Sequence, residues 1–376
     1  MSAALPAGGL PRWAANGVLP LVNLLAAFVV AGIVILIIGE SPIQALAVLV
    51  RGAFGFPEAW GYTLYYATNF IFTALAVSVA LHCGLFNIGG EGQGYLGGLG
   101  VGLVCLFLDG LPQVLLLPLA VGAGALFGAA WAWVPGYLQA RRGSHIVITT
   151  IMFNFLAATL MVYLLVNVLI DPGQMSPQSR PFAEHVRLPA MHEVLGWVGI
   201  DFPRTPLNMA FPWALVCGAG VWIFIWHTRW GYELRTVGAN TDAAVYAGIL
   251  PSRNIVRAMA ISGALAGMMG LNEIMGVSHR LLLNFTAGYG FVGIAVSLMG
   301  RNHPVGIVLA SLLFGALYQG GAELAFEMPK VSRELVVVIQ GLVIMFVGAL
   351  EFLFLPALRP WLRARRAAAA ASEERA

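Results

Sequence analysis

Long apolar runs dominate this chain, and short polar or proline-containing breaks separate them. A helix that crosses a bilayer needs ~20 consecutive apolar residues, with a range of ~17–25. By that template the pattern predicts an all-α, polytopic membrane protein with about ten transmembrane helices. The predicted spans are residues 19–39, 62–82, 88–108, 113–134, 145–170, 209–228, 255–275, 288–300, 304–320 and 334–355.

The third predicted span has an unusual composition. Between Gly84 and Gly102 the sequence reads GLFNIGGEGQGYLGGLGVG, with Asn87, Glu91 and Gln93 set among nine glycines. Glycine weakens a helix by ~1 kcal/mol relative to alanine, and a carboxylate at the bilayer centre costs at least ~2.5 kcal/mol. Such a segment is tolerated at membrane depth only where protein buries it or where it lines a water-filled cavity. The composition therefore indicates part of a translocation pathway.

Composition narrows the function further. The chain has 376 residues, of which 59% are hydrophobic and 10% charged, whereas a soluble domain carries ~25% charged residues. The net charge of +3 gives no nucleic-acid signal, the three cysteines form no CxxC pair, and the histidines form no HExxH pair. We therefore expect no nucleic-acid partner, no metal site and no cofactor.

Arginine placement orients the predicted spans. With the N-terminus in the cytoplasm, thirteen basic residues fall on the inner side and seven on the outer side, in agreement with the positive-inside rule. Residues 1–18 and 356–376 are then cytoplasmic ends of a transmembrane domain at 19–355. Within that domain we expect an extracytoplasmic loop at 171–208 and a cytoplasmic loop at 228–254.

The sequence also contains a candidate internal repeat. Phe86-Asn-Ile-Gly89 opens the third span and Phe285-Thr-Ala-Gly288 opens the eighth. Spans that are five apart run in opposite directions, as an inverted five-plus-five repeat requires. In transporters with that symmetry, glycine-interrupted segments at matching places mark the binding site. Chance similarity between two glycine-rich spans is the alternative.

Four segments in register resemble one family. They are GLFNIGGEGQ, ITTIMFNF, LRTVGANTDAAVYAGI, and GALAGMMGLNEIMGV followed by GYGFVGIAVSLMGRNHPVGI. They are similar to the signatures of permease subunits of bacterial ABC importers of the branched-chain amino acid, simple sugar and nucleoside class, most closely the nucleoside type. The resemblance covers about residues 80 to 350. Gly90 and Thr236 depart from the family pattern, which has alanine at both, and neither change removes a functional group.

This resemblance implies a permease subunit, not an enzyme. Such a subunit pairs with a second permease subunit, with a heterodimer as the expected arrangement, and resides in the bacterial cytoplasmic (inner) membrane. It recruits a cytoplasmic ABC ATPase and receives substrate from an extracytoplasmic substrate-binding protein. The chain agrees in one respect, because it contains no GxxxxGK[ST] phosphate loop of its own.

Polar and aromatic residues in three spans are the candidates for the substrate pathway. Glu91 could instead cap N–H groups where the glycine-rich turn enters its own helix. Amides at membrane depth could equally bond helix to helix, and the aromatic residues could be packing or interfacial side chains. The predicted pathway residues are Asn87, Glu91, Gln93, Asn154, Tyr289 and Phe291.

The cytoplasmic loop is the candidate for coupling to the ATPase. Its centre is rich in small residues, which suit a helix that docks closely into a partner. A helix lying on the membrane surface is the alternative, but such a helix needs bulky apolar anchors. The predicted coupling residues are Arg235, Gly238, Asn240, Ala243, Ala244, Gly248 and Ile249.

Other functions stay open from the sequence. The substrate could be a nucleoside, a simple sugar or a branched-chain amino acid, in descending order of preference. Intramembrane carboxylates such as Glu91 and Glu273 could also serve a self-sufficient, proton-coupled carrier or a channel. Asn272 and Glu273, which close the seventh span, are interpreted first as helix-interface residues.

Overall fold

The computed structural model describes residues 19–346, and every regular element in that range is helical. The predicted terminal segments 1–18 and 356–376, and the end of the tenth predicted span, lie outside the described residues. The chain divides into two units, Met1–Gly52 with Gly320–Ala376, and Ala53–Gln319.

Within its described residues, 19–52 and 320–346, the first unit holds three helices around a small apolar core, to which the end of a helix that begins in the second unit also contributes. They are α1 (Leu19–Ile37), α2 (Pro42–Phe54, which ends just past the unit's boundary) and α14 (Arg333–Ile344). The chain bends by 118° between α1 and α2, so these two form either one broken span or a re-entrant pair. Ala31, Ile35 and Val336 belong to the buried core of this unit.

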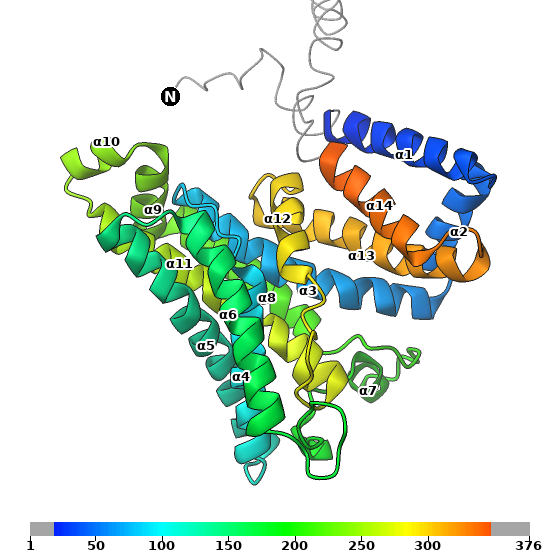
Figure 1. Ribbon diagram of the computed structural model, residues 1–376, viewed down its shortest axis with the longest axis horizontal. Helices are drawn as coiled ribbons and strands as arrows, with labels where there is room; N and C mark the ends of the chain where they lie inside the picture. The colour runs from blue at the N-terminus through cyan, green and yellow to red at the C-terminus, as the bar shows by residue number, and fades with distance from the viewer. Residues whose placement is uncertain (1–18, 347–376) are drawn as a thin grey trace, which may run out of the picture. The chain divides into compact units, whose positions relative to one another are not determined.

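The second unit holds most of the helices (Figure 1). The helix α11 is followed by a π-helical segment, η3, and α13 continues past residue 319, where this unit ends. The elements are α3 (Pro57–His82), α4 (Gly90–Phe107), α5 (Gln113–Arg142), α6 (Ile146–Asn167), η2 (Glu184–Val186), α7 (Met191–Trp197), α8 (Ala210–His227), α9 (Arg229–Ala239), α10 (Thr241–Tyr246), α11 (Pro251–Gly267), η3 (Leu271–Ser278), α12 (Tyr289–Met299) and α13 (Pro304–Glu327).

Six of the described helical segments are long and apolar enough to cross a membrane, and the bent α1–α2 pair would make a seventh. Burial separates them into two kinds. In an apolar stretch of 18 residues in α3, 83% of the residues are buried, whereas in the corresponding stretch of α5 only 22% are buried. The helix α3 is therefore central, and α5 presents most of its surface outward. The chain is thus a polytopic helical membrane protein.

The glycine-rich helix α4 is not among those six, because glycine and polar residues lower its hydropathy. Nearly all of its residues are buried, as expected for a segment that protein must shield from lipid. Close packing explains the glycines. A methyl group on Gly97 would lie 2.1 Å from the Cα of Gly267 in α11, and one on Gly128 in α5 would lie 2.2 Å from the carbonyl oxygen of Gly263. Small residues let these three helices approach backbone to backbone.

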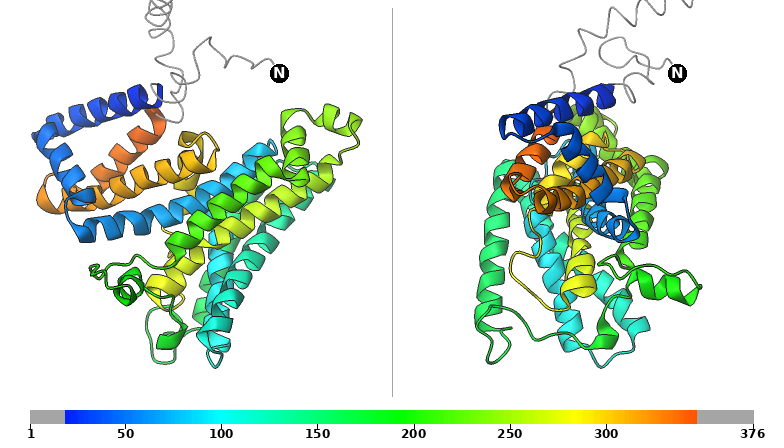
Figure 2. Two further views of the ribbon diagram at one scale, coloured as in Figure 1. Left: turned by 180° about the vertical axis from the view of Figure 1, so that it is seen from behind. Right: turned by 90° about the vertical axis from the view of Figure 1, so that its right-hand side faces the viewer.

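The two long connections of this unit lie at opposite ends of its helices. Figure 2 shows α9 and α10 at one end of α5, α6 and α11, and the segment that contains α7 at the other. The expected loop 228–254 therefore folds largely into two short helices, and 171–208 contains η2 and α7.

The helix bounds differ from the predicted spans in two instructive places. The sequence template omitted α2, which has only 13 residues and carries Gln44 and Arg51. It also treated 255–275 as one helix, whereas the structure changes from α-helix to π-helix near Leu271. Hydropathy is insensitive to both features, because it measures the length and polarity of a run and not its hydrogen-bond pattern.

Candidate functional site

Asn87 organises the loop between α3 and α4. Its side-chain oxygen accepts hydrogen bonds from the Gly89 N–H at 2.8 Å and from Gln93 Nε2 at 3.1 Å. Its Nδ2 donates to Gln93 Oε1 at 3.0 Å and to Ser262 Oγ of α11 at 2.8 Å. Asn87 and Gln93 are each only 1% exposed. The two amides therefore satisfy one another and connect this loop to α11.

Asn154 of α6 holds the same loop from the other side. Its Oδ1 accepts from the Gly92 N–H at 2.8 Å, and its Nδ2 donates to the Ile88 carbonyl at 2.9 Å. The Gly92 N–H lies in the first turn of α4, where backbone donors lack partners within the helix. Asn154 thus caps α4 from a neighbouring helix.

Glu91 caps a different helix from the one that carries it. One carboxylate oxygen accepts from the Thr286 hydroxyl at 2.5 Å and from the Gly288 N–H at 2.9 Å. The other accepts from the Gly290 N–H at 2.9 Å. Gly288 is the N-cap of α12 and has a φ of 80°, a left-handed conformation that suits glycine. Both oxygens of Glu91 therefore have partners, and the side chain is 9% exposed.

The N-termini of α4 and α12 meet at this point. A methyl group on Gly290 would lie 2.2 Å from the Glu91 backbone nitrogen, so the two backbones are in direct contact. Each helix N-terminus carries about half a positive charge. The Glu91 carboxylate lies where two such partial charges would otherwise repel. It offsets both partial charges and accepts hydrogen bonds from the N–H groups at the start of α12.

The two predicted aromatic residues have different surroundings. Tyr289 is 6% exposed and packs edge-on against Phe70 of α3, with ring centroids 5.5 Å apart. Phe291, two residues later, is 47% exposed. Because their exposure differs so much, only Tyr289 belongs to the interior of the unit.

A second polar cluster lies around η3, and the sequence indicated only part of it. The Glu273 Oε1 atom accepts from the Tyr65 hydroxyl at 2.7 Å and from Asn69 Nδ2 at 2.5 Å. Asn272 donates to Asn69 Oδ1 at 2.9 Å and accepts from Asn208 at the same distance. Glu273 is 6% exposed and Asn272 is 1% exposed. The signal for Tyr65 and Asn69 was weak, since a single polar residue in a long apolar helix has many interpretations.

The predicted coupling segment touches the turn that leads into the first polar cluster. A methyl group on Gly238, near the end of α9, would lie 2.3 Å from the His82 carbonyl oxygen and 2.8 Å from the Gly84 nitrogen. Gly84, with a φ of 74°, turns the chain from α3 toward Asn87. The backbone of α9 therefore rests directly on the start of the Asn87 loop.

Ion pairs and an aromatic ring attach α9 to α11. Glu233 of α9 lies 3.5 Å from the Arg257 guanidinium, which also stacks 4.7 Å above the Trp230 ring. Arg235 of α9 is half-buried, and its Nε has no hydrogen-bond partner in the described part of the chain. The segment thus contacts both the Asn87 loop and α11.

The short helix α10 presents an exposed surface. The Asn240 side chain caps it by accepting from the Ala243 N–H at 3.0 Å, and Ala244 is fully buried. Tyr246, which the predicted coupling set omitted, is 97% exposed. Of the other predicted residues, Ala243 and Gly248 are exposed and Ile249 is partly buried.

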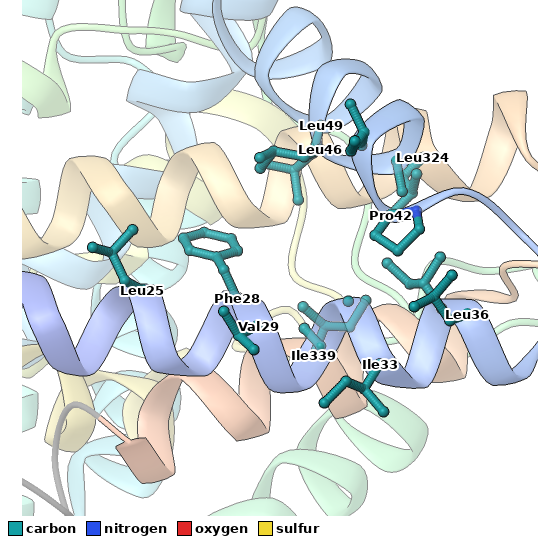
Figure 3. A pocket seen from close by; sticks show the side chains of 15 residues that line it. Leu25, Phe28, Val29, Ile33, Leu36, Pro42, Leu46, Leu49, Leu324 and Ile339 are labelled. Atoms are coloured by element: carbon teal, nitrogen blue, oxygen red, sulfur yellow. The ribbon is translucent and has the colours of Figure 1, made fainter.

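Two apolar pockets lie away from both polar clusters. One, in the first unit, has a volume of about 460 Å³ and is lined by side chains such as Phe28, Leu46 and Ile339 (Figure 3). The other has a volume of about 320 Å³ and lies between α8 and α13, near Trp222. Neither contains a predicted pathway residue. Among residues 19–346, no group of three His, Cys, Asp or Glu could hold a metal ion.

Comparison with known proteins assigns the family. The family described as "Branched-chain amino acid transport system / permease component" matches residues 59–348. The chain belongs to this family. Its match spans both polar clusters, α9 and α10, and it confirms the resemblance drawn from the four sequence segments.

Curated relatives of the permease come from several organisms. A guanosine ABC transporter permease protein of Bacillus subtilis is 35% identical, over 88% of this chain and 92% of the relative. A glucose ABC transporter permease protein of Haloferax volcanii is 34% identical, over 92% and 90%. A nucleoside ABC transporter permease protein of Lactococcus lactis is 31% identical, over 88% and 90%. No solved structure is a significant match.

Proposed function

We propose that this chain is the permease subunit of an ATP-driven ABC importer for nucleosides. The observation that carries the substrate class is the neutralisation of two helix N-termini by Glu91. In other transporters such termini bind anionic groups of the substrate. Here an internal carboxylate takes that place, which favours an uncharged polar solute over an amino acid. The names of the guanosine and nucleoside relatives support this choice. The glucose relative keeps simple sugars as the second candidate.

The proposed pathway passes the interior cluster of the second unit. Asn87, Gln93 and Asn154 are amides that both donate and accept, as an uncharged solute requires. In the structure they bond to one another or to the α4 backbone. They would therefore exchange those partners for substrate as the loop moves. Glu91 would hold the N-termini of α4 and α12 together. In α12, Tyr289 would provide a buried ring to the pathway, and the exposed Phe291 would lie at its outer edge.

The proposed topology has ten spans in an inverted five-plus-five repeat with both termini in the cytoplasm. The meeting of the α4 and α12 N-termini supports it, because these helices open with the two similar segments and make reciprocal contact at Gly90 and Gly290. The shorter apolar helices α12 and α14, together with α4, would supply spans that strict length and hydropathy criteria omit.

The proposed coupling element is the segment from Arg235 to Ile249. Its exposed end at Tyr246 would dock on a cytoplasmic ABC ATPase. Movement would pass through the Gly238 backbone contact to the Asn87 loop. A second permease subunit and an extracytoplasmic substrate-binding protein would complete the importer in the bacterial inner membrane.

Removing the ATPase tests the proposed function directly. Cells that express the complete system should accumulate tritiated guanosine, and deletion of the partner ATPase gene alone should abolish that accumulation. The control is a strain that carries the deletion and a plasmid copy of the ATPase. Uptake that persists at the wild-type rate without the ATPase would show a self-sufficient carrier or channel.

Replacing Gly238 with alanine tests the coupling route. The added methyl group meets backbone atoms at His82 and Gly84, so α9 must shift away from the Asn87 loop. We expect nucleotide hydrolysis by the assembled complex to continue while uptake falls at least about tenfold. Gly220→Ala in α8 is the matched control, since nothing lies within 4 Å of its added methyl group. Equal uptake by the two variants would contradict the route.

A further inference from the structure

Glu273 is a buried carboxylate with half of its hydrogen-bonding capacity in use. The side chain is 6% exposed, and both of its donors, Tyr65 and Asn69, bond to Oε1. The Oε2 atom accepts no hydrogen bond from any residue between 19 and 346. A buried carboxylate without its full set of donors is costly. An intramembrane ionisable residue in that condition indicates a functional site.

The backbone around Glu273 is also specialised. It belongs to η3, a π-helical segment that runs from Leu271 to Ser278. Such segments are uncommon and occur often at functional sites. The wider turn of a π-helix changes the direction in which successive side chains point, and here it places Asn272 and Glu273 against α3.

Three tyrosines form a triangle beside this carboxylate. The ring centroids of Tyr66 and Tyr318 are 5.6 Å apart, those of Tyr289 and Tyr318 are 6.1 Å apart, and those of Tyr66 and Tyr289 are 6.5 Å apart. Tyr65, which donates to Glu273, lies next to this group, with its ring centroid 5.0 Å from that of Tyr66. Tyr289 is the most enclosed of the three. It is buried, whereas Tyr66 and Tyr318 are each partly exposed. The three rings therefore extend from a partly exposed side, at Tyr66 and Tyr318, toward the buried carboxylate of Glu273.

We propose that this cluster is a binding station for the base of a nucleoside, that is, for a flat heteroaromatic ring that carries an N–H donor. The ring stacks on the faces of Tyr66 and Tyr318, and its N–H group donates to Glu273 Oε2. The proposal deepens the proposed function and rests on it for the identity of the substrate. Few polar groups in an aromatic surround are typical of small-molecule sites.

The arrangement also explains the position of Tyr289. That residue lies between Gly288 and Gly290, whose N–H groups both donate to Glu91. The Glu91 cap thus fixes the start of α12 and, with it, the buried ring beside Glu273. Glu91 acts on the station as a positioning residue, while Glu273 contacts the ligand.

Direct binding tests the station separately from transport. The probe is tritiated guanosine, measured by equilibrium dialysis with the purified membrane complex of permease subunits and ATPase, without the substrate-binding protein, and with ribose as the competitor. We expect guanosine to bind and excess ribose not to displace it. Stacking contributes ~1–3 kcal/mol per base, and tenfold in affinity corresponds to ~1.4 kcal/mol. Tyr318→Leu should therefore weaken guanosine binding about tenfold, and Tyr318→Phe should not. Glu273→Gln replaces a charged acceptor with a neutral one and should weaken binding by about the same factor.

Matched controls separate binding from folding. Glu327→Gln makes the same chemical change at a carboxylate that pairs with Arg51 in the first unit, and it should leave binding unchanged. If Glu273→Gln fails to accumulate, the comparison of Tyr318→Leu with Tyr318→Phe decides. Guanosine binding that is absent, or that these variants leave unaltered, overturns the station. ATP-dependent uptake by the wild-type system would in that case still support the proposed function. Binding at Glu273 without such uptake would overturn the proposed function alone.

Discussion

Glu91 and Glu273 are two buried carboxylates in the same unit, each beside a break in regular α-helix, yet their partners differ. Glu91 receives three hydrogen bonds, spread over both oxygens, and two of the donors are backbone N–H groups. Glu273 receives two, both on one oxygen and both from side chains. Backbone donors at a helix terminus are fixed in place, whereas side-chain donors can rotate away. Burial alone therefore does not identify a side chain that contacts a ligand. The number of hydrogen bonds that each of its oxygens already accepts must be known as well.

Replacing Glu91 with alanine should have the largest effect. The Thr286 hydroxyl and the N–H groups of Gly288 and Gly290 would lose their acceptor. Unpaired buried donors cost ~1–3 kcal/mol each, so the three together predict a loss of roughly 3–9 kcal/mol in stability. Membrane abundance and the melting temperature in detergent measure it, and Glu91→Gln should fall between wild type and alanine. Normal abundance of Glu91→Ala with impaired uptake would place Glu91 with Glu273 as a ligand contact.

Replacing Gly290 with alanine should be the next most damaging change. The new methyl group would meet the Glu91 backbone at 2.2 Å, and overpacking of this kind typically costs ~1–3 kcal/mol. The melting temperature should fall, whereas Gly122→Ala in α5, where the methyl group has nothing within 4 Å, should be neutral or stabilising. If the two variants melted together, the contact between the α4 and α12 N-termini would lose its support.

Replacing Tyr65 with phenylalanine tests the surroundings of Glu273 and should have a smaller effect on stability. The change removes one of the two donors to Glu273 Oε1, and a hydrogen bond to a charged group contributes ~1.5–3 kcal/mol. We expect a moderate drop in melting temperature, smaller than for Glu91→Ala because Asn69 still donates. Tyr163→Phe, at a residue that is 58% exposed, is the control. A drop as large as that of Glu91→Ala would remove the distinction between the two sites.

Replacing Phe291 with alanine should have the smallest effect. The side chain is 47% exposed, and substitutions at exposed positions usually change stability by less than ~1 kcal/mol. Membrane abundance should stay near wild type, while Tyr289→Leu, at the buried ring two residues earlier, should lower guanosine uptake. Slower guanosine uptake by Phe291→Ala than by Tyr289→Leu would instead indicate that the pathway follows the exposed face of α12.

Hydropathy predicted the long helices well because their signal is local. The predicted span 145–170 corresponds to α6. The sequence required the Gly84–Gly102 segment to be either buried in protein or lining a cavity, and most of α4 is buried. The predicted coupling segment forms short helices outside the predicted spans.

The partners of Glu91 could not be predicted in the same way. A capping role was one of the two interpretations, but the expected donors belonged to the entrance of its own helix. The actual donors lie about 195 residues further along the chain, at Thr286, Gly288 and Gly290. Sequence spacing within one helix carries no information about such a contact. The single unused oxygen of Glu273 likewise depends on where Tyr65 and Asn69 fall in space.

The cap at Glu91 has an electrical consequence. Two helix N-termini contribute about half a positive charge each, and one carboxylate cancels their sum. A charge that crosses a membrane potential of 100 mV exchanges ~2.3 kcal/mol with the field, but this junction carries almost no net charge to be displaced. The proposed passage of an uncharged solute beside it should therefore proceed at the same rate in polarised and depolarised membranes, provided that the supply of ATP is held constant.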